Sequence, residues 1–510
     1  MRIHEVPPAI ADARMAQALR DVELANPGAT AATGTTRAQR WVFGVLAALV
    51  LAGLWRWPST VGVALMVCST GLYLATVVHR ISLVRASLED DPSVRVTDAA
   101  ARALRDRDLP VYTVLVPAYG EPEVLGDLIR SLERLEYPRD RLDVKLLLEN
   151  GDEPTIAEAM AIETDLPVDV LVVPPGEPRT KPRALDYGLQ FARGDLVTIY
   201  DAEDHPEPLQ LRRVAVAFRR SPASRACFQA RLSFFGGRRN LLTRWFTAEY
   251  LTWFHLYLPG LILRDACIPL GGTSNHFRAT ALREVGGWDA HNVTEDCDLG
   301  VRLQRRGWTI GLVDSTTMEE PNTDVINWVK QRSRWYKGYL QTFLVQFRRP
   351  RALLDDLGWR RTVHLVLFVG CTPILAVMNL WFWGLAVVWV TTRAAFVQSM
   401  FPGVTYHVAL LAWVLGNLSV VYLSVLTVRE ARRPDLLVAV LVSPLYWVLM
   451  SIAGVRAAVQ LVTAPSHWEK TTHGLAKGPA EPRSSGPDGG AERAAASAPH
   501  GPEPADRLRA

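Results

Sequence analysis

The stretch LVTIYDAED, residues 196–204, joins a short apolar run to three carboxylates. Residues 196–200 predict a β-strand, because the run is rich in β-branched and aromatic side chains. Asp201, Glu203 and Asp204 follow at once, and closely spaced carboxylates at a strand end suit Mg²⁺ or Mn²⁺. We therefore predict a divalent cation site at these three residues; the alternative is a solvated acidic turn before Pro206.

Three apolar runs upstream predict further strands of the same sheet. They cover residues 111–116, 144–148 and 168–173, and a helical pattern separates the first two. Strands that alternate with helices indicate an α/β domain with a mostly parallel sheet, which binds ligands at the carboxyl ends of its strands. Glu149 and Asp152 follow the second strand and are expected near Asp201. No GxGxxG or Walker A pattern is present, which argues against dinucleotide and P-loop sites.

Thr294-Glu295-Asp296 begins a helical pattern downstream of a small-residue loop, Gly-Gly-Thr-Ser-Asn-His at 271–276. The loop allows a ligand to approach the backbone closely. A carboxylate at the start of the helix could act as a general base. The alternative is a helix N-terminus whose acidic residues only complement the helix dipole.

Gln331, Arg334 and Trp335 recur at helical spacing i, i+3 and i+4. An amide, a guanidinium and an indole therefore share one face of a helix, which suits a diphosphate and a stacked sugar ring. The alternative is a belt of Arg and Trp at a membrane interface. Lys181 and Arg183 could also contact phosphate, although isolated basic residues are usually surface charges.

Composition indicates apolar segments joined to an ordinary globular domain. The 510 residues are 49% hydrophobic but still 21% charged, with a net charge of +4. No run of Lys or Arg marks a nucleic-acid partner, so none is expected. The five cysteines lie far apart without CxxC spacing, which argues against a disulfide framework and a structural zinc site.

Five uncharged stretches, at residues 41–55, 60–78, 363–390, 406–428 and 436–455, predict membrane helices rather than helices buried in a soluble core. The first two predict a hairpin, and arginines after Arg80 place the following domain in the cytoplasm. The arginine-rich loop at 429–433 would then leave the C-terminus outside the cell. The gating segment described below requires the opposite, so we expect residues 363–390 to form a broken hairpin or re-entrant element.

These motifs, in this order, resemble those of a membrane-embedded family 2 glycosyltransferase of the cellulose and hyaluronan synthase type. The resemblance covers residues 111–474. Val116-Pro117-Ala118-Tyr119-Gly120-Glu121 is similar to the family's VPxYNE, with Gly120 in place of Asn. Glu149 and Asp152 stand where the family has an acidic pair, although Asn150 replaces one of the family's acids in this segment. Lys181 to Asp186 resembles KxxALN, Asp201 and Glu203 match DxD, Thr294 to Asp296 matches TED, and Gln331 to Trp335 matches QxxRW.

The resemblance implies a GT-A-like catalytic domain and inverting, processive transfer from a UDP-sugar, chiefly UDP-glucose, to a growing polysaccharide. Asp296 would be the catalytic base, with Mg²⁺ or Mn²⁺ at the leaving group. Donor-binding residues would be Pro117, Tyr119, Glu121, Glu149, Asp152, Lys181, Arg183, Asp201, Gln331 and Arg334. Acceptor-binding residues would be Trp335, Glu295, Asn275 and His276. His467 to Gly474 resembles the gating segment of such synthases, with Trp468, Lys470 and Thr471 as gating residues.

The expected organisation places a multi-pass enzyme in the inner or plasma membrane, with lipid and accessory export subunits as its partners. Its parts are a loose segment (1–40), a transmembrane hairpin (41–80), a cytoplasmic glycosyltransferase domain (81–360), transmembrane and interfacial helices (361–462), the gating segment (463–476) and a disordered tail (477–510). The alternatives are a non-processive transferase that uses a lipid-linked acceptor, and a non-catalytic membrane scaffold or transporter.

Overall fold

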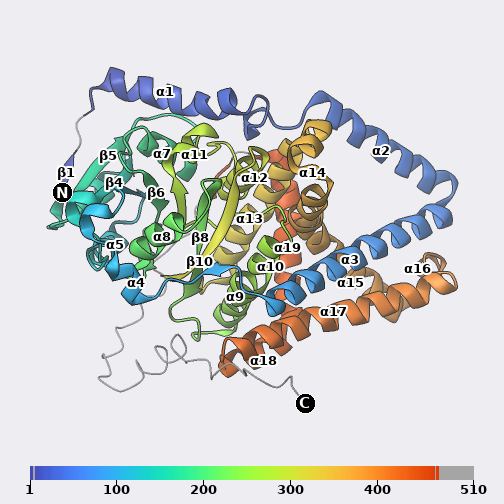
Figure 1. Cartoon of the computed structure of the whole chain (residues 1–510). Coiled ribbons are helices and arrows are strands. Elements are labelled where there is room, and N and C mark those ends of the chain that lie inside the picture. Colours follow the sequence, from blue (N-terminus) through green and yellow to red (C-terminus); the bar gives the residue numbers. More distant parts are fainter. Residues whose placement is uncertain (4–5, 466, 470–510) are drawn as a thin grey trace, which may run out of the picture.

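A mixed β-sheet forms the centre of the α/β domain in the computed structural model, which describes residues 1–3, 6–465 and 467–469 (Figure 1). The strand order is β1 (Arg2–Ile3), β5 (Val168–Val173), β4 (Leu142–Glu149), β3 (Tyr112–Ala118), β6 (Leu196–Ile199), β9 (Asn275–Arg278), β8 (Arg225–Phe234), β10 (Thr309–Glu319) and β2 (Ser93–Val94). Only β9 runs antiparallel to its neighbours in this order, and β7 (His205–Pro206) pairs with β10. The predicted strands and the mostly parallel sheet are confirmed.

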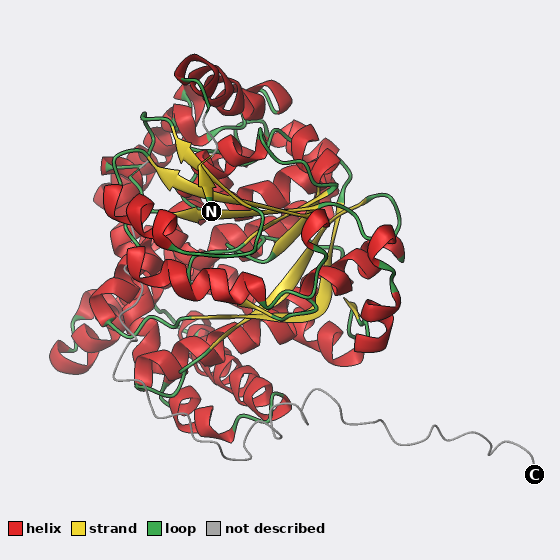
Figure 2. Ribbon diagram, turned by 90° about the vertical axis from the view of Figure 1, so that its left-hand side faces the viewer, coloured by secondary structure: helices red, strands yellow, loops and turns green. Residues whose placement is uncertain are grey.

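Helices cover both faces of this sheet, as Figure 2 shows. Alternate side chains of β3, such as Leu115 and Val116, enter different cores. One core contains α7 (Lys181–Leu189), α11 (Ala279–Glu284) and α12 (Glu295–Arg305); the other contains α5 (Pro122–Glu133) and α8 (Gln210–Arg219). Burial on both faces explains why the strands are continuous apolar runs. Shorter helices complete the domain: α4 (Asp98–Ala103), η2 (Asp106–Asp108), η3 (Arg139–Arg141) and α6 (Glu153–Ala161).

Two elements connect the sheet to the long apolar helices. The first is α9 (Leu241–Thr252), which continues through the π-helical turn η4 (Trp253–Tyr257) into α10 (Leu258–Leu263). The second is α13 (Val325–Gln346), which carries Gln331, Arg334 and Trp335. Both meet apolar helices on the side of the sheet where the strand ends carry the predicted site.

The N-terminal segment is ordered, so the expectation of a loose stretch over residues 1–40 is wrong. Helix α1 (Pro8–Ala25) buries Met15, Ala18 and Val22, which lie on one face by their i, i+3, i+7 spacing. Arg14 donates to the backbone carbonyl of Gln190 at 2.8 Å. Beyond α1, the short helix η1 (Ala31–Thr33) lies beside α13, because Arg348 donates to the carbonyl of Thr30 at 2.7 Å.

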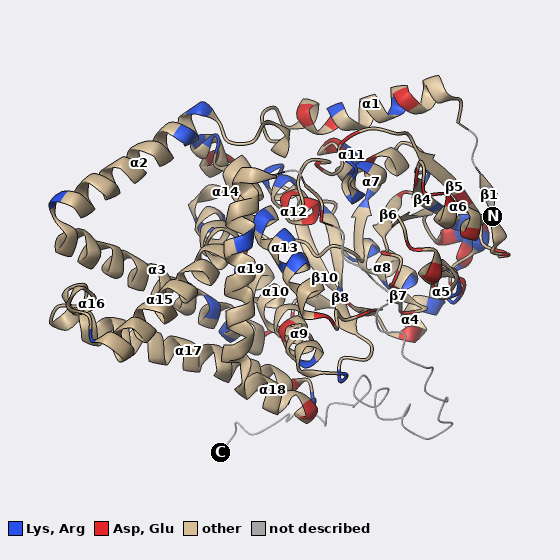
Figure 3. Cartoon of the chain, turned by 180° about the vertical axis from the view of Figure 1, so that it is seen from behind, with Lys and Arg blue, Asp and Glu red and all other residues tan. Residues whose placement is uncertain are grey.

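Five helical segments of the described chain are long and apolar enough to cross a membrane. They contain α2 (Arg37–Arg56), α3 (Pro58–Glu89), α14 (Pro350–Leu365) with η5 (Val366–Gly370) and α15 (Cys371–Thr392), α17 (Val404–Glu430), and α19 (Ser443–Thr463). Figure 3 shows α2, α3, α15 and α17 projecting from one side of the molecule, with few charged residues along their lengths. The short α16 (Ala395–Ser399) lies in the connection between α15 and α17.

Residues 363–390 do not form a broken hairpin, so that expectation is also wrong. They continue as one helical path from α14 through the π-helical turn η5 into α15. Pro373 falls in the first turn of α15, directly after η5, where a π turn accommodates the missing backbone donor. Asn379, the other expected break, instead donates to the Ser451 hydroxyl of α19 at 3.2 Å.

Helix α19 packs along α13, and both of its ends lie beside the α/β domain. Just before it, η6 (Pro434–Leu436) and α18 (Leu437–Leu441) contact that domain through an Arg238–Asp435 ion pair at 3.0 Å. After it, Lys337 donates to the His467 carbonyl at 2.7 Å. The loop that ends at Asp435 and residue His467 therefore both contact the same α/β domain.

Candidate active site

One cavity of about 1110 Å³ runs from the carboxyl ends of the central strands into the space between the apolar helices. Its catalytic-domain end includes expected donor residues, listed here together: Pro117, Tyr119, Glu121, Glu149, Lys181, Asp201, Gln331 and Arg334. Glu203, Glu295, Asp296, Trp335 and Trp468 also line it. The motifs that lie far apart in the sequence thus meet around one space.

Lys181 stands at the first turn of α7 and joins two walls of this cavity. Its Nζ forms an ion pair with Asp201 and donates to the carbonyl of Gly272 at 2.8 Å. Burial disfavours the charged amine, but Asp201 and Glu295 outweigh this effect and raise the pKa of Lys181. The side chain therefore stays cationic and can attract a phosphate group.

Carboxylates crowd this end of the cavity. Burial raises the pKa of Glu203, and Asp201 and Glu121 raise it further. Glu319, at the end of β10, lines the same space, and its Oε1 is buried without a hydrogen-bond partner among the described residues. Burial, and then Asp204 and Glu203, likewise raise the pKa of Glu319. Such like-charge crowding fits a site for a cation.

Within the described residues, no group of three or more His, Cys, Asp or Glu side chains is arranged to hold a metal ion. Asp204 is fully buried and faces away from the cavity lining, because its Oδ2 accepts from the backbone N–H of Asp201 at 2.7 Å and from the Thr273 hydroxyl. The remaining oxygen donors, Asp201 and Glu203, fit the usual Mg²⁺ arrangement of one or two carboxylates completed by substrate phosphates.

Asp296 lies at the start of α12, with its carboxylate on the cavity wall. Its Oδ1 accepts from the Cys297 N–H at 2.7 Å, while Oδ2 lies toward the Gly272 loop. Burial raises the pKa of Asp296 to about 6. Burial and the Asp296 charge together raise the pKa of the neighbouring Glu295 to about 8. At neutral pH, therefore, Asp296 is the ionised member of the pair and can accept a proton.

Gln331, Arg334 and Trp335 line the cavity from α13, as their spacing predicts. The guanidinium of Arg334 stacks on Trp468, with its carbon 4.5 Å from the ring centroid. Trp468 comes from the segment after α19, and Glu469 beside it is held by Arg456 at 2.6 Å and 2.8 Å. The other expected gating residues, Lys470 and Thr471, lie outside the described residues.

Four expected binding residues do not line the cavity and need correction. Asp152 caps α6 and accepts from the Gly120 N–H, so it braces two loops. Arg183 is 1% exposed and donates to the Pro174 carbonyl at 2.5 Å. Asn275 is buried and donates to the Gly271 carbonyl, and His276 is fully buried against the Tyr112 hydroxyl at 2.7 Å. None of these four residues is part of the cavity lining, and each uses at least one polar atom to bind a neighbouring protein group.

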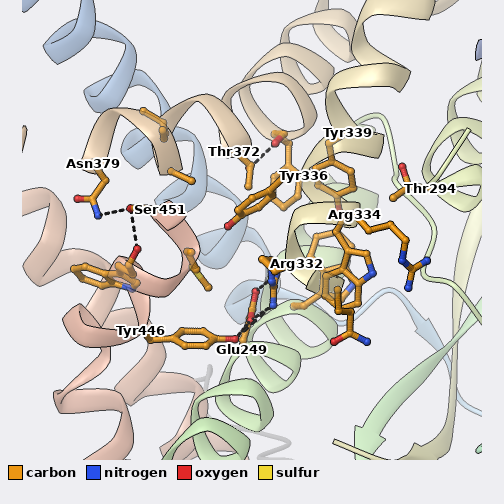
Figure 4. Close-up of a pocket in the computed structure, with 18 of the residues that line it drawn as sticks. Glu249, Thr294, Arg332, Arg334, Tyr336, Tyr339, Thr372, Asn379, Tyr446 and Ser451 are labelled. Atoms are coloured by element: carbon orange, nitrogen blue, oxygen red, sulfur yellow. Dashed lines mark hydrogen bonds and ion pairs between the residues drawn. The ribbon is translucent and has the colours of Figure 1, made fainter. Parts of the chain in front are cut away.

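Arg332, Glu249 and Tyr446 form a second polar group on the cavity wall that no sequence motif identified (Figure 4). Arg332 donates to both carboxylate oxygens of Glu249 at 2.7 Å and 2.6 Å. The Tyr446 hydroxyl donates to Glu249 Oε2 at 2.7 Å. The three residues come from α13, α9 and α19, so only the folded chain brings them together.

Residues 110–338 match a family profile described as "Glycosyltransferase like family 2". A β-monoglucosyldiacylglycerol synthase from Synechocystis is 28% identical over 331 residues, which cover 63% of this chain and 66% of that protein. A probable glucomannan 4-β-mannosyltransferase from Arabidopsis thaliana is 28% identical over 249 residues, or 47% of this chain and 56% of that protein. The chain thus spans less than two thirds of the length of either relative.

Among solved structures, a mannosyltransferase from Pyrobaculum calidifontis in complex with GDP-Man and Mn²⁺ shares the fold. The superposition has a TM-score of 0.50 at 16% identity and covers 78% of this chain and 98% of that one. This likeness confirms the expected GT-A-like arrangement of the sheet and its helices. It also shows that a protein of this fold can accommodate a sugar nucleotide together with a divalent ion.

Proposed function

Because residues 110–338 form a glycosyltransferase family 2 domain with a GT-A-like fold, we propose that the chain transfers a sugar from a UDP-sugar, chiefly UDP-glucose, to a growing β-glycan. Transfer is processive and inverts the anomeric centre. The observation that supports this proposal is the continuous cavity, whose lining includes Asp296, the Lys181–Asp201 pair and residues of the apolar helices.

In this mechanism Asp296 takes the proton of the acceptor hydroxyl on Oδ2, since Oδ1 is engaged by the Cys297 N–H. The acceptor oxygen forms a bond to the anomeric carbon from the face opposite the diphosphate. The bond from that carbon to the diphosphate oxygen breaks, and UDP leaves with the electron pair. A single displacement inverts the configuration.

Charge on the departing diphosphate is balanced by Lys181 and Arg334, both of which line the cavity. Asp201 and Glu203 would hold a Mg²⁺ or Mn²⁺ ion, which neutralises a diphosphate when bound. Trp468 covers the guanidinium of Arg334, so closure of the segment that carries it would exclude water and fix the donor.

The membrane part of the cavity supports a polymer as the acceptor. Polar side chains from four helices line it, and two pairs of them are hydrogen-bonded: Tyr73 to Asn417 at 3.3 Å and Asn379 to Ser451 at 3.2 Å. Aromatic rings such as Trp413 lie on the same walls. Weak polar contacts and aromatic faces suit a sugar chain that has to slide outward.

A non-processive transferase onto a lipid acceptor is the second candidate. Phe382, Trp389 and Phe401 also line the membrane part of the cavity and would accommodate acyl chains. The Synechocystis relative is named as a glucosyldiacylglycerol synthase. The candidates differ in their product, which is a long polysaccharide in the first and a glycolipid in the second.

For topology, we place the catalytic domain in the cytoplasm and the α2–α3 and α15–α17 hairpins across the plasma membrane. Helix α19 then lies at the membrane boundary along α13 and does not cross, because residues on both sides of it contact the catalytic domain. Four crossings leave both termini inside. This assignment agrees with the arginines at 429–433, which favour the cytoplasmic side.

Membranes that contain the full chain, supplied with radiolabelled UDP-glucose and Mg²⁺, test the function. We expect label in a polymer that a linkage-specific β-glucanase degrades. Label that is extracted into chloroform and methanol as a glycolipid would replace the first candidate with the second. Absence of transfer from every UDP-sugar tried, in membranes that bind UDP, would contradict both.

A further inference from the structure

The Arg332–Glu249 pair stands at the middle of the cavity, between its two functional ends. In Figure 4, Arg334 and Thr294 lie to one side of it, and Tyr446, Asn379 and Ser451 lie to the other. The Arg332 side chain is only 7% exposed, whereas that of Glu249 is 29% exposed and lines the cavity. Both residues line the cavity, and the carboxylate is the more exposed of the two polar groups that this pair presents to a ligand.

Glu249 also has capacity for another hydrogen bond. A carboxylate has about four lone-pair positions, and Oε2 already accepts from Arg332 and from the Tyr446 hydroxyl. Oε1 accepts from Arg332 alone among the hydrogen bonds of the described residues. An acceptor-only oxygen on a cavity wall suits a ligand that offers hydroxyl donors, and it disfavours a negatively charged ligand.

Trp335 completes the arrangement beside this carboxylate. The guanidinium carbon of Arg332 lies 4.6 Å from the Trp335 ring centroid, so Arg332 contacts both the indole and Glu249. Phe246 packs against the same indole at 5.9 Å. The indole is therefore held in place next to Glu249, and an aromatic plate beside a hydrogen-bonding carboxylate is suited to a sugar ring, which has an apolar face and a hydroxylated edge.

We propose that Glu249 is an acceptor-recognition residue: it accepts a hydrogen bond from a hydroxyl of the terminal acceptor sugar while Trp335 stacks on that ring. Arg332 and Tyr446 are positioning residues that orient the carboxylate. This inference rests on the proposed function, because it names the acceptor as a carbohydrate. It also gives the boundary helix α19 a role at the site through Tyr446.

A purely structural role is the competing explanation. A buried ion pair is weak evidence for stability, because apolar residues of similar volume often stabilise a protein as well or better. A structural pair would also have no need to expose its carboxylate on the cavity wall. The two explanations differ in what a variant loses: recognition of the acceptor alone, or folding and donor binding together.

The test uses the full chain in detergent, with UDP-glucose as the donor and cellotetraose as the acceptor probe. For Glu249→Gln we expect the KM for cellotetraose to rise about tenfold while the Kd for UDP stays within about twofold, because a site built to bind a hydroxyl loses specificity when its acceptor group is weakened. Asp265→Asn is the matched control, since Asp265 pairs with Arg361 at 2.6 Å outside the cavity lining.

Tyr446→Phe is a second variant that is less disruptive to the fold, because it keeps the Arg332–Glu249 ion pair and the aromatic ring at position 446 and removes only the hydroxyl. We expect the KM for cellotetraose to rise about threefold, for the loss of one hydrogen bond that orients Glu249. Tyr137→Phe is its control, since that hydroxyl donates to the Pro110 carbonyl at 2.6 Å away from the cavity. An unchanged KM in both Glu249→Gln and Tyr446→Phe would overturn the inference, as would an equal loss of UDP binding.

Failure of the proposed function gives a different result. A wild-type chain that binds UDP but glucosylates dioleoylglycerol and no saccharide would refute the polymer acceptor and the sugar site together. A wild-type chain that extends cellotetraose, with variants that behave like their controls, would refute only the role of Glu249.

Discussion

At the nucleotide end of the cavity, Asp201, Glu203, Asp296 and Glu319 line the wall with Lys181, whereas at its middle Glu249 is matched by Arg332 and Tyr446. The first region carries an excess of carboxylates, and burial and mutual repulsion raise the pKa of Glu203 and Glu319. In the second region, the positive charge of Arg332 balances the negative charge of Glu249. A charged donor with its cation fits the first, and an uncharged acceptor fits the second.

The sharpest test of this division is Asp296→Asn, for which we expect the largest effect. Sugar transfer should fall by about 10³-fold, the size of a typical general-base contribution, while the Kd for UDP changes by less than about threefold. Transfer assays and UDP titration of the same preparation measure both values. A comparable loss of UDP binding would mean that Asp296 contributes to donor binding rather than acting as the base.

Loss of the divalent cation, or of a carboxylate that would hold it, should give the next largest effect. For Asp201→Ala, or for wild type in excess EDTA, we expect transfer to fall about 10²-fold, because the diphosphate loses its main counter-charge. Mn²⁺ or Mg²⁺ should restore the EDTA-treated wild type but not the variant. Full transfer in EDTA would leave Lys181 and Arg334 as the groups that stabilise UDP.

The pH dependence of sugar transfer distinguishes the two regions, because the base Asp296 in the first region titrates in the range that can be measured. Asp296 acts as a base only when ionised, and its pKa is raised to about 6. Transfer should therefore be nearly constant between pH 7 and 8 and should fall by about tenfold per pH unit below 6, as the carboxylate becomes protonated. The KM for the acceptor should change less over the same range. A flat profile down to pH 5 would exclude Asp296 as the titrating base.

The meeting of the carboxylates at one end of the cavity could be predicted from the sequence, because these residues follow predicted strands in short motifs. Asp201 and Glu203 come directly after β6, and the carboxyl ends of parallel strands meet at one edge. The orientation of a side chain was not predictable in this way: Asp204, one residue from Glu203, turns away to bind the Asp201 N–H.

In the proposed acceptor region, the helical motif predicted Trp335, but the group formed by Arg332, Glu249 and Tyr446 could not be predicted, because no local pattern links its members. Glu249 and Tyr446 are 197 residues apart, and Tyr446 belongs to a stretch that length and hydropathy assign to a membrane span. Only the packing of α19 against both α9 and α13 brings the two together. The N-terminal helix, by contrast, has a local signal in the spacing of Met15, Ala18 and Val22, which lie on one helical face.

The smallest expected effect concerns the segment that covers the donor end. Trp468→Leu removes the ring that lies 4.5 Å from the guanidinium carbon of Arg334. Loss of one cation–π contact in a partly buried site should reduce turnover by about three- to tenfold. UDP binding should weaken less than turnover, because the contact positions a donor that Lys181 has already attracted. Trp359→Leu is the control, since Trp359 is 70% exposed and lies outside the cavity lining.

Steady-state turnover and UDP titration of the two variants decide whether this segment belongs to the nucleotide end. Its position is fixed by Lys337 and by the Arg456–Glu469 pair, so the ring can be removed without releasing the backbone. Equal losses of turnover and UDP affinity would mean that Trp468 only adds binding energy. Unchanged kinetics would mean that Trp468 contributes neither to turnover nor to UDP binding. The nucleotide end would then be formed by the catalytic domain and its helices alone, without the segment that follows α19.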